Sequence, residues 1–430
     1  MDQIRGGLPK TEENHRRRPW KGVEDVEFAT LEWVAWYNAS RLLEPIAYGS
    51  TPLLRMGAPS RQGCYGTFVS HANIDPGPDP ECGRAPIQAA ASGSRQKTGP
   101  GGRPPHVVAV VLNWNNLPDT LECVDSLQRS DYSNLAILVV DNDSREDPST
   151  VLHERHPGAR VLRNARNLGY GGGNNSGLRR AIDAGAAYVL LLNNDVVVAP
   201  DMVRRLVMAA EADGLIAMAT PRVFYYDRPT EVYWDGGIID WETCETPHDS
   251  QGLPIEGELK RSEWLDGCSL LVRVSAIPHI GLLDERYFLY FEDAEWSVRA
   301  LRRGWTNAVV LQASSWHKVS RSTGGLARPA VRFYYARNRY LFLKAHCPAG
   351  KRFLWRLRYA SRIFQEYRLN RYEAEFREAI VAACVSIARG HWGPYEPGGR
   401  CPRLVRLLDM LLLLVVKTTS AVGRLLGQGR

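Results

Sequence analysis

Three short apolar runs, each followed directly by polar residues, constrain the fold of this chain more than any other feature of the sequence. The runs occupy residues 107–112, 135–140 and 188–192. Continuous apolar runs of this length are typical of strands that are buried on both faces of a sheet. Helix-like patterns at residues 117–128 and 172–184 lie between them. Strands that alternate with helices predict βαβ units and a mostly parallel sheet.

Further elements extend this pattern along the chain. Residues 159–162 are a shorter strand candidate, and residues 200–212 are a helix candidate that starts with proline at a first-turn position. Later strand candidates, at residues 269–274, 287–291 and 308–311, are short and separated by polar residues. We therefore expect an α/β fold with helices on both sides of the sheet.

Shifts in composition divide the 430 residues into four expected segments. The first holds one amphipathic helix candidate, at residues 23–46. The second is rich in Pro, Gly, Ser and Arg and is expected to be an irregular linker. The third carries the α/β pattern, and the fourth is expected to be helical and basic, over residues 351–388 and 404–426. The segments are residues 1–50, 51–105, 106–345 and 346–430.

Charge and cysteine content favour a cytoplasmic protein. The formal net charge of +7 favours polyanionic or anionic-membrane neighbours, although such a balance is usually a property of the solvated surface. The eight cysteines include no close pair of the kind that binds zinc or forms a redox dithiol, which fits a reduced compartment. The first residues lack the apolar core of a secretory signal, and the apolar run at residues 410–416 is too short to span a membrane.

The first two apolar runs end in polar residues that are placed to meet a ligand. Asn113 and Trp114 follow the first run, and Asp141 and Asn142 follow the second. Open α/β sheets bind ligands at the carboxyl ends of their strands, where a carboxylate accepts the imino proton of a pyrimidine or the hydroxyls of a ribose. We assign Asp141 to the base, with capping of the next helix as the alternative.

The third run ends in Asn193, Asn194 and Asp195. A divalent cation that bridges two phosphates needs a hard oxygen ligand, and Asp195 supplies one. Water and phosphate oxygens would complete the shell, which is normal for Mg²⁺ and tolerable for Mn²⁺. His317 is a candidate for a further ligand or a diphosphate contact, although a lone histidine is more often a structural hydrogen-bonding group.

A glycine-rich stretch, NLGYGGGNNSG at residues 167–177, precedes that third run. Its glycines, Gly171 among them, permit close approach of the backbone to a ligand, and the helix that they open favours phosphate at its N-terminus. Asn174 lies in the same turn. The stretch follows the third strand candidate in chain order, which disfavours a nicotinamide-binding fingerprint.

A pair of acids stands where an expected short strand gives way to a helix, in FLYFEDAEWSVRALRRGW at residues 288–305. The acids are Glu292 and Asp293. A helix N-terminus stabilises an ionised carboxylate, so Asp293 is a candidate general base. Helix capping, or pairing with Arg299 or Arg302, is the alternative.

Six motifs resemble, in this order, those of bacterial family-two inverting glycosyltransferases, especially the rhamnosyltransferase-like branch. They are LNWNN, VVDNDS, RNLGYGGGNNSG, LLLNNDV, DERYFLYFEDAEW and WHKVSRSTGG, and the resemblance covers residues 107–343. It implies a GT-A fold, a nucleoside-diphosphate sugar donor and a divalent metal, Mg²⁺ or Mn²⁺. It also implies transfer of a sugar, with rhamnose as one candidate, to a hydroxyl of a glycan or polyprenyl-linked acceptor in cell-surface polysaccharide synthesis.

The resemblance also implies roles for single positions. Asp141 matches the aspartate that contacts the nucleoside, Asp195 the metal-binding end of the Asp-x-Asp motif, and Asp293 the catalytic base of the Glu-Asp motif. His317 matches the histidine that closes on metal or diphosphate. The chain departs from the usual pattern in having Asn193 at the first position of Asp-x-Asp. The expected site residues are Asp293 and Glu292 for catalysis; Asn113, Trp114, Asp141, Asn142, Gly171, Asn174, Asn193, Asn194 and Gly267 for the donor; and Asp195 and His317 for the metal.

Residues 14–47 resemble something different, the C-terminal tail of integrase-type transposases from bacterial insertion sequences. Such transposases need a complete ribonuclease-like fold, which does not fit before Pro45. We therefore expect an inert remnant, with a native helical extension as the alternative.

Two other functions compete with sugar transfer. A nucleic-acid-binding protein is suggested by the positive charge and by the basic, aromatic residues 351–372, but it explains none of the strand-end residues, so no nucleic-acid partner is expected. An inactive relative of the enzyme is the second, given the foreign first segment. Residues 351–372 and 404–426 also suit the inner face of an anionic plasma membrane, as peripheral helices, or packing on the main domain.

Overall fold

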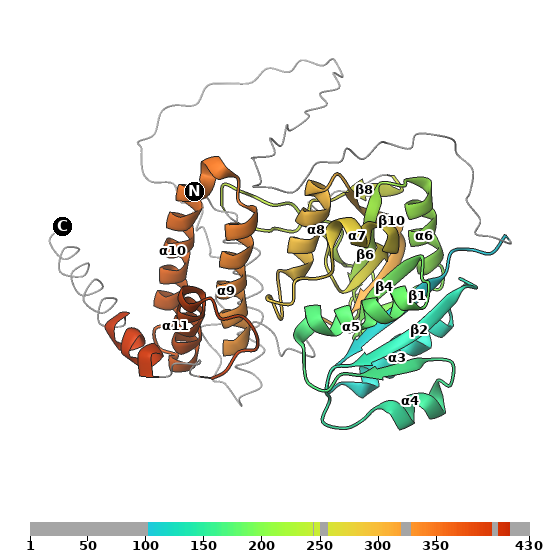
Figure 1. Cartoon of the computed structure of the whole chain (residues 1–430), viewed down its shortest axis with the longest axis horizontal. Coiled ribbons are helices and arrows are strands. Elements are labelled where there is room, and N and C mark those ends of the chain that lie inside the picture. The colour runs from blue at the N-terminus through green and yellow to red at the C-terminus, as the bar shows by residue number, and fades with distance from the viewer. Residues whose placement is uncertain (1–101, 244, 250–256, 320–327, 398–402, 413–430) are drawn as a thin grey trace, which may run out of the picture. The chain divides into compact units, whose positions relative to one another are not determined.

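The structure is a computed structural model (Figure 1), and the chain divides into two units, residues 1–73 and 74–430. All residues described below belong to the second unit. They are residues 102–243, 245–249, 257–319, 328–397 and 403–412. The helix expected at residues 23–46, most of the expected linker and most of residues 404–426 lie outside the described residues.

One ten-stranded sheet forms the centre of the described residues, with the order β3-β2-β1-β4-β9-β6-β10-β5. β7 pairs with β6, and β8 pairs with β10, beside this path. The strands are β1 (Val107–Asn113), β2 (Leu135–Asp141), β3 (Arg160–Arg163), β4 (Tyr188–Asn193), β5 (Val196–Val198), β6 (Ile216–Tyr225), β7 (Val232–Trp234), β8 (Leu259–Arg261), β9 (Ser269–Arg273) and β10 (Thr306–His317). β1 to β4 pair in parallel, and β10 pairs in parallel with β6. β9 runs antiparallel between β4 and β6.

Helices flank this sheet and continue beyond it (Figure 1). They are α3 (Leu117–Gln128), α4 (Ser149–Arg155), α5 (Gly169–Asp183), α6 (Met202–Ala212), α7 (Ile277–Ile280), α8 (Glu292–Arg302), α9 (Pro329–His346), α10 (Arg352–Leu369) and α11 (Ala374–Arg389). α9 and α11 form a second hydrophobic cluster with Tyr367 and Val405. Within the described residues, no helix combines the length and apolar character that a membrane span needs.

The expected α/β fold class is confirmed, and the first strands and helices start within a few residues of their expected positions. α3 covers the expected residues 117–128. The strand expected at residues 287–291 is wrong: these residues lie outside any strand, and Phe288, Tyr290 and Phe291 have φ values of 64°, 71° and 73°. A strand needs a negative φ at every such residue.

The strand ends that carry polar residues are level with each other. Asn113 pairs with Asp141 across β1 and β2, and Leu112 pairs with Asn193 across β1 and β4. Because these strands are parallel, their carboxyl ends meet at one edge of the sheet. That edge holds the candidate site.

The glycines of α5 bring this helix close to β1. A Cβ atom on Gly177 would lie 2.4 Å from Val110 Cγ1, and one on Gly173 would lie 2.6 Å from Leu112 Cδ1. Real Cβ atoms do not approach other atoms so closely, so larger residues at these positions would push the helix away from the strand.

Candidate functional site

One cavity of about 600 Å³ opens at the carboxyl ends of β1 and β4. Asp195 and Asp293, the two acids on which the expected chemistry depends, both line it. Nine of the expected site residues contribute to its wall: Trp114, Asn142, Asn193, Asn194, Asp195, Gly267, Glu292, Asp293 and His317. The structure therefore brings together residues that lie far apart in the sequence.

Asp293 lies in the first turn of α8 and is held by two backbone amides. Its Oδ1 accepts a hydrogen bond from the Ala294 N–H at 2.7 Å, and its Oδ2 accepts one from the Gly267 N–H at 3.1 Å. Burial and the negative charge of Asp266 raise the pKa of Asp293 to about 7, against the lowering effect of these amides. A carboxylate with such a pKa is suited to accept a proton near neutral pH.

Glu292 lies beside Asp293 and is only 4% exposed. Its Oε2 has no hydrogen-bond partner among the described residues. Burial, followed by the charge of Asp293, raises the pKa of Glu292 well above its usual value. An unpaired buried carboxyl oxygen is costly, so a ligand group is the natural partner for this atom.

Asp195 and His317 face each other across neighbouring strands. His317 pairs with Val196 between β10 and β5, and its Nε2 lies 3.2 Å from Asp195 Oδ1. Burial lowers the pKa of His317, but the hydrogen bond to Asp195 and the charges of Asp195 and Asp266 outweigh it and raise the pKa. Nδ1 of His317 has no partner in the described part of the chain.

Asp195 and His317 offer one carboxylate oxygen and one imidazole nitrogen to a cation. The described residues contain no group of three or more His, Cys, Asp or Glu side chains that could hold a metal ion. Such a short donor set fits Mg²⁺ or Mn²⁺, which take water and substrate phosphate oxygens as further ligands. It does not fit a structural zinc site, which needs four protein ligands.

Asp141 lies in a buried network behind the cavity and is 0% exposed. Its Oδ1 accepts hydrogen bonds from Asn113 Nδ2 at 2.8 Å and from Ser144 Oγ at 2.5 Å, and Arg163 Nε lies 3.5 Å from its Oδ2. Asn113 and Asp141 are not among the residues that line the cavity. In this conformation they hold the turn after β2, and the nucleoside contact of Asp141 stays a prediction.

The glycine-rich start of α5 packs against the protein itself. The N–H of Tyr170 donates to the Phe288 carbonyl oxygen at 2.6 Å, and a Cβ on Gly169 would lie 2.3 Å from that oxygen. Asn174 donates to the Tyr170 carbonyl within the helix. Gly171 and Asn174 do not line the cavity, whereas Gly169 does, and its missing side chain makes room for Phe288 in the loop that precedes Asp293.

Asp266 belongs to the loop at residues 264–266, which the family resemblance matched to the region beside the donor sugar and acceptor without a role for any single side chain. It lines the cavity, and its Oδ1 accepts a hydrogen bond from the Cys268 N–H at 2.8 Å. Its charge raises the pKa of both Asp293 and His317.

The wall also includes residues of α9 and of the segment after α11, where no site residue was expected. Tyr334 and Tyr335 of α9 line the cavity, together with Pro394 and Tyr395 from the segment after α11. Tyr334 stacks on Phe288, with ring centroids 5.5 Å apart and planes at 9°. The cavity therefore has an acidic and amide-rich side and an aromatic side.

Comparisons with known proteins identify the class to which this fold and site belong. Residues 108–257 match the family model described as Glycosyl transferase family 2. Over 235 residues, the chain is 29% identical to an N-acetylglucosaminyl-diphospho-decaprenol L-rhamnosyltransferase of Mycobacterium tuberculosis, a match that covers 50% of this chain and 76% of that protein. A low-salt glycan biosynthesis hexosyltransferase, Agl10 of Haloferax volcanii, is 27% identical over 177 residues, 38% of this chain and 53% of that protein.

Residues 108–257 thus match glycosyltransferase family 2, and the resemblance read from the motifs is confirmed. The GT-A type of α/β fold expected from that resemblance is confirmed with it. The second resemblance is confirmed too: a putative transposase for insertion sequence element IS986/IS6110 of Mycobacterium tuberculosis is 50% identical over 38 residues. That match covers 9% of this chain and 14% of the transposase.

Proposed function

We propose that this protein is an inverting glycosyltransferase that moves a sugar from a nucleoside-diphosphate donor to a hydroxyl group of a glycan or lipid-linked acceptor. The observation that carries the proposal is the shared cavity of about 600 Å³, with Asp195 and His317 in its wall and Asp293 in the same wall. The family match over residues 108–257 supports this assignment.

The proposed reaction is a single displacement. The Asp293 carboxylate removes the proton of the acceptor hydroxyl, and the oxygen then forms a bond to the anomeric carbon of the donor sugar. The bond from that carbon to the phosphate oxygen breaks, and the nucleoside diphosphate leaves with the electron pair. Attack opposite the leaving group inverts the anomeric configuration. No carboxylate nucleophile is needed for this scheme.

Glu292 has a separate proposed role next to the base. Burial raises the pKa of Glu292 well above its usual value, and we assign its carboxyl to substrate binding rather than to removal of the acceptor proton. Its unpartnered Oε2 is placed to form a hydrogen bond with a substrate hydroxyl.

Asp195 and His317 are the residues that would hold a divalent cation, and a bound cation would neutralise charge on the departing diphosphate. Asn193, Asn194 and Trp114 also line the cavity and are proposed to contact the donor. Rhamnose is the first candidate sugar because the mycobacterial relative is named as an L-rhamnosyltransferase. A polyprenyl-diphosphate-linked sugar is the first candidate acceptor for the same reason.

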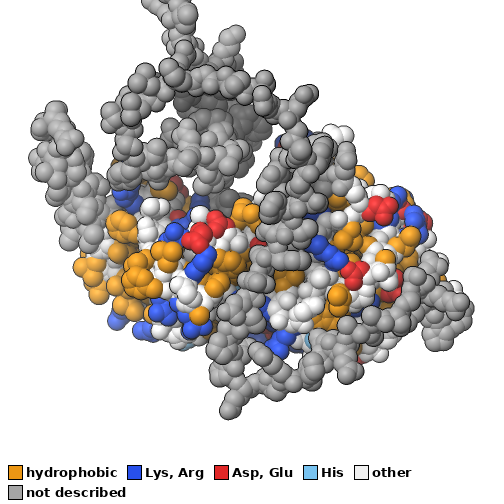
Figure 2. Space-filling model, turned by 90° about the horizontal axis from the view of Figure 1, so that it is seen from above, with side chains coloured by type: hydrophobic (Ala, Val, Ile, Leu, Met, Phe, Trp, Pro, Cys, Tyr) orange, Lys and Arg blue, Asp and Glu red, His pale blue; other side chains and the backbone are white. Residues whose placement is uncertain are grey.

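Peripheral contact of the protein with an anionic membrane would bring a lipid-linked acceptor close to the cavity. The C-terminal helices expose large apolar side chains among arginines, a combination that suits a membrane surface. Figure 2 shows these hydrophobic and basic side chains together on the left of the view. The exposed large apolar residues among the described residues from Phe353 onward are Phe353, Leu354, Leu357, Phe364, Leu369, Tyr372, Leu407, Met410, Leu411 and Leu412.

A panel of nucleotide sugars tests the proposal. We expect one or more of them, with Mn²⁺ or Mg²⁺, to raise the melting temperature of the full chain and to release nucleoside diphosphate when acceptor is added. Octyl N-acetylglucosaminide and a membrane extract serve as acceptors. A folded protein that neither binds nor consumes any nucleotide sugar would overturn the proposal, and salt-dependent DNA binding in its place would favour a nucleic-acid function.

A further inference from the structure

The loop that delivers Asp293 has an unusual backbone. Residues 286–291 lead directly into α8, and Phe288, Tyr290 and Phe291 have left-handed φ values of 64°, 71° and 73°. Residues with a Cβ rarely adopt this conformation, and aromatic residues do so least readily. A loop with three such residues persists only when its surroundings hold it.

Asn338 of α9 supplies part of that hold. Its Nδ2 lies 2.8 Å, 2.7 Å and 2.8 Å from the carbonyl oxygens of Tyr287, Leu289 and Tyr290. The side chain is completely buried. One buried amide group therefore contacts three carbonyl oxygens of the loop.

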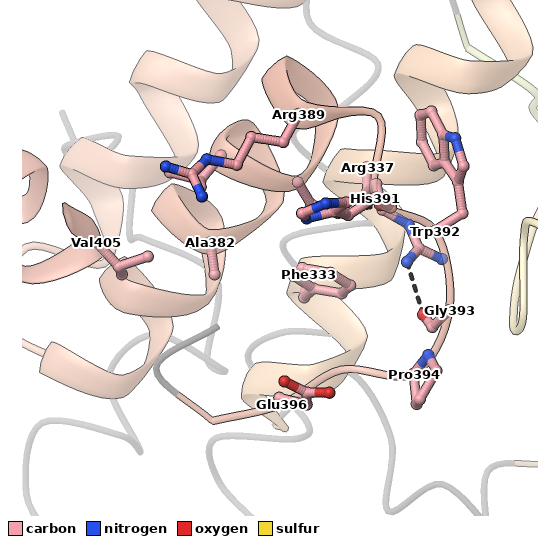
Figure 3. Close-up of a pocket in the computed structure, with 12 residues that line it drawn as sticks. Phe333, Arg337, Ala382, Arg389, His391, Trp392, Gly393, Pro394, Glu396 and Val405 are labelled. Carbon is pink, nitrogen blue, oxygen red and sulfur yellow. Dashed lines mark hydrogen bonds between the residues drawn. The ribbon is translucent and has the colours of Figure 1, made fainter. Parts of the chain in front are cut away.

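Arg337, the preceding residue, continues this arrangement. Its Nη2 donates to the carbonyl oxygens of Tyr287 at 2.7 Å and Arg286 at 3.2 Å. Its Nη1 donates to the Gly393 carbonyl at 2.7 Å, as Figure 3 shows. The loop before Asp293 and the turn that carries Pro394 are thus joined through one guanidinium.

Arg337 is 1% exposed, and its hydrogen-bond acceptors in the described residues are all carbonyl or amide oxygens, so hydrogen bonds rather than an ion pair define its contacts there. The guanidinium carbon lies 5.0 Å, 5.2 Å and 5.9 Å from the ring centroids of Phe333, Tyr334 and Trp392. Burial lowers the pKa of Arg337 to about 10. Burying a cation without an anion is unfavourable. The guanidinium of Arg337 offers several N–H donors in a fixed geometry, which neither a lysine nor a neutral side chain supplies.

We propose that Arg337 and Asn338 are positioning residues for the transfer reaction: they hold loop 286–291 in its left-handed conformation and so fix Asp293 against the Gly267 amide. This inference rests on the proposed function for its catalytic part. It makes α9 and the turn at Gly393 parts of the catalytic unit, although they follow the family-model match in the chain.

The test compares buried arginines in the same helical region. Arg337→Gln and Asn338→Ala should lower kcat by up to about 100-fold, the scale expected for a misplaced catalytic group, while the KM for the donor changes little. The acid limb of the pH–rate profile should also move, because the surroundings of Asp293 change. Arg337→Lys should not restore kcat, since one ammonium cannot replace the guanidinium fork.

Arg377→Gln is the matched control. Arg377 of α11 is also buried, but it pairs with Asp409, at 3.1 Å between Nε and Oδ1, and does not contact the loop. The Arg377→Gln variant should be less stable than the unaltered protein, but its kcat and its pH–rate profile should not change. Hydrogen exchange gives a readout that needs no substrate: amides of residues 286–291 should exchange faster in Arg337→Gln and Asn338→Ala than in Arg377→Gln.

Two results would overturn the proposal. One is a normal kcat and pH profile in Arg337→Gln and Asn338→Ala, with only the loss of stability seen in Arg377→Gln. The other is unchanged exchange of the loop amides in both variants. If the unaltered protein transfers no sugar, the proposed function fails, and the exchange measurement still decides whether the pair holds the loop.

Discussion

The backbone N–H of Gly267 donates a hydrogen bond to Oδ2 of Asp293 at 3.1 Å. Gly267 follows Asp266 and precedes Cys268, whose carbonyl accepts the Asn193 N–H at 3.0 Å. One short turn therefore links the candidate base to the strand end that leads to Asp195. The positions of the two acids are coupled through the backbone, and a change in this turn is expected to affect both.

Asp293→Asn should strongly slow transfer and stabilise the protein. Asparagine keeps the size of the side chain but cannot accept a proton, so kcat should fall by about 100- to 10,000-fold. The raised pKa means that ionised Asp293 destabilises the fold: the penalty grows as the pH rises from the ordinary value of 3.8 to about 7 and then levels off. The gain in melting temperature of the variant should follow that pH course. A variant that keeps its activity would remove Asp293 from the mechanism.

Asp266→Asn should shift the pH–rate profile to lower pH. The charge of Asp266 raises the pKa of Asp293, second only to burial, so its removal lowers that pKa. The acid limb of kcat/KM, expected near pH 7 in the unaltered protein, should move down. Asp227→Asn, at an exposed acid outside the cavity lining, is the control and should leave the limb in place. An unmoved limb in Asp266→Asn would show that the two acids are not coupled.

Asp195→Asn and His317→Gln should weaken the effect of metal on donor binding. The two side chains face each other at 3.2 Å, and we expect the apparent Mn²⁺ affinity to fall by roughly 10-fold or more in each variant. The measurement is the Mn²⁺ concentration needed for a nucleoside diphosphate to raise the melting temperature. Equal metal dependence in both variants and the unaltered protein would place the cation elsewhere.

Gly177→Ala should destabilise the fold despite the higher helix propensity of alanine, which contributes about 1 kcal/mol. The new Cβ would lie 2.4 Å from Cγ1 of the fully buried Val110, and overpacking of this kind costs typically about 1–3 kcal/mol. Gly158→Ala is the matched control, since nothing lies within 4 Å of its Cβ position, and should change stability by less than about 0.5 kcal/mol. Chemical denaturation measures both, and equal stability of the two variants would contradict the packing argument.

The sequence was sufficient for the parts of the fold that local pattern determines. β1, β2 and β4 were predictable because a short, continuous apolar run is stable as a strand buried in the middle of a sheet. Their carboxyl ends lie side by side because the strands pair in parallel. Residues 287–291 were predicted wrongly because their aromatic composition favours a strand. Their actual backbone depends on Arg337 and Asn338, which act from α9, and no local pattern reveals such a contact.

The site also has residues that the sequence revealed and residues whose orientation it did not. Asp195, Asp293 and His317 were singled out from their motifs, and all three line one cavity, while their roles stay predictions. Asp141 was assigned to the nucleoside, yet its carboxylate is taken up by Asn113 and Ser144 in a buried network. Strand-end position alone does not determine whether a side chain turns toward the ligand or into the turn that follows.

The exposed apolar side chains of α10 should determine binding to anionic vesicles. Phe353 and Leu357 are 75% and 54% exposed, one helical turn apart, with Arg352 and Arg356 next to them. Burial of each CH₂ group in lipid contributes about 0.8 kcal/mol, so replacing both residues by serine should weaken vesicle binding by at least about tenfold. Co-flotation with vesicles of anionic phospholipid measures the effect, and neutral vesicles should bind less in every case.

Met208 and Leu215, exposed at 56% and 54% on another part of the surface, provide the matched double replacement, which should bind as the unaltered chain does. Equal vesicle binding by both double variants, or no binding by the full chain, would contradict a membrane contact through the apolar side chains of α10. The protein would then have to bind its acceptor without contact between α10 and a membrane.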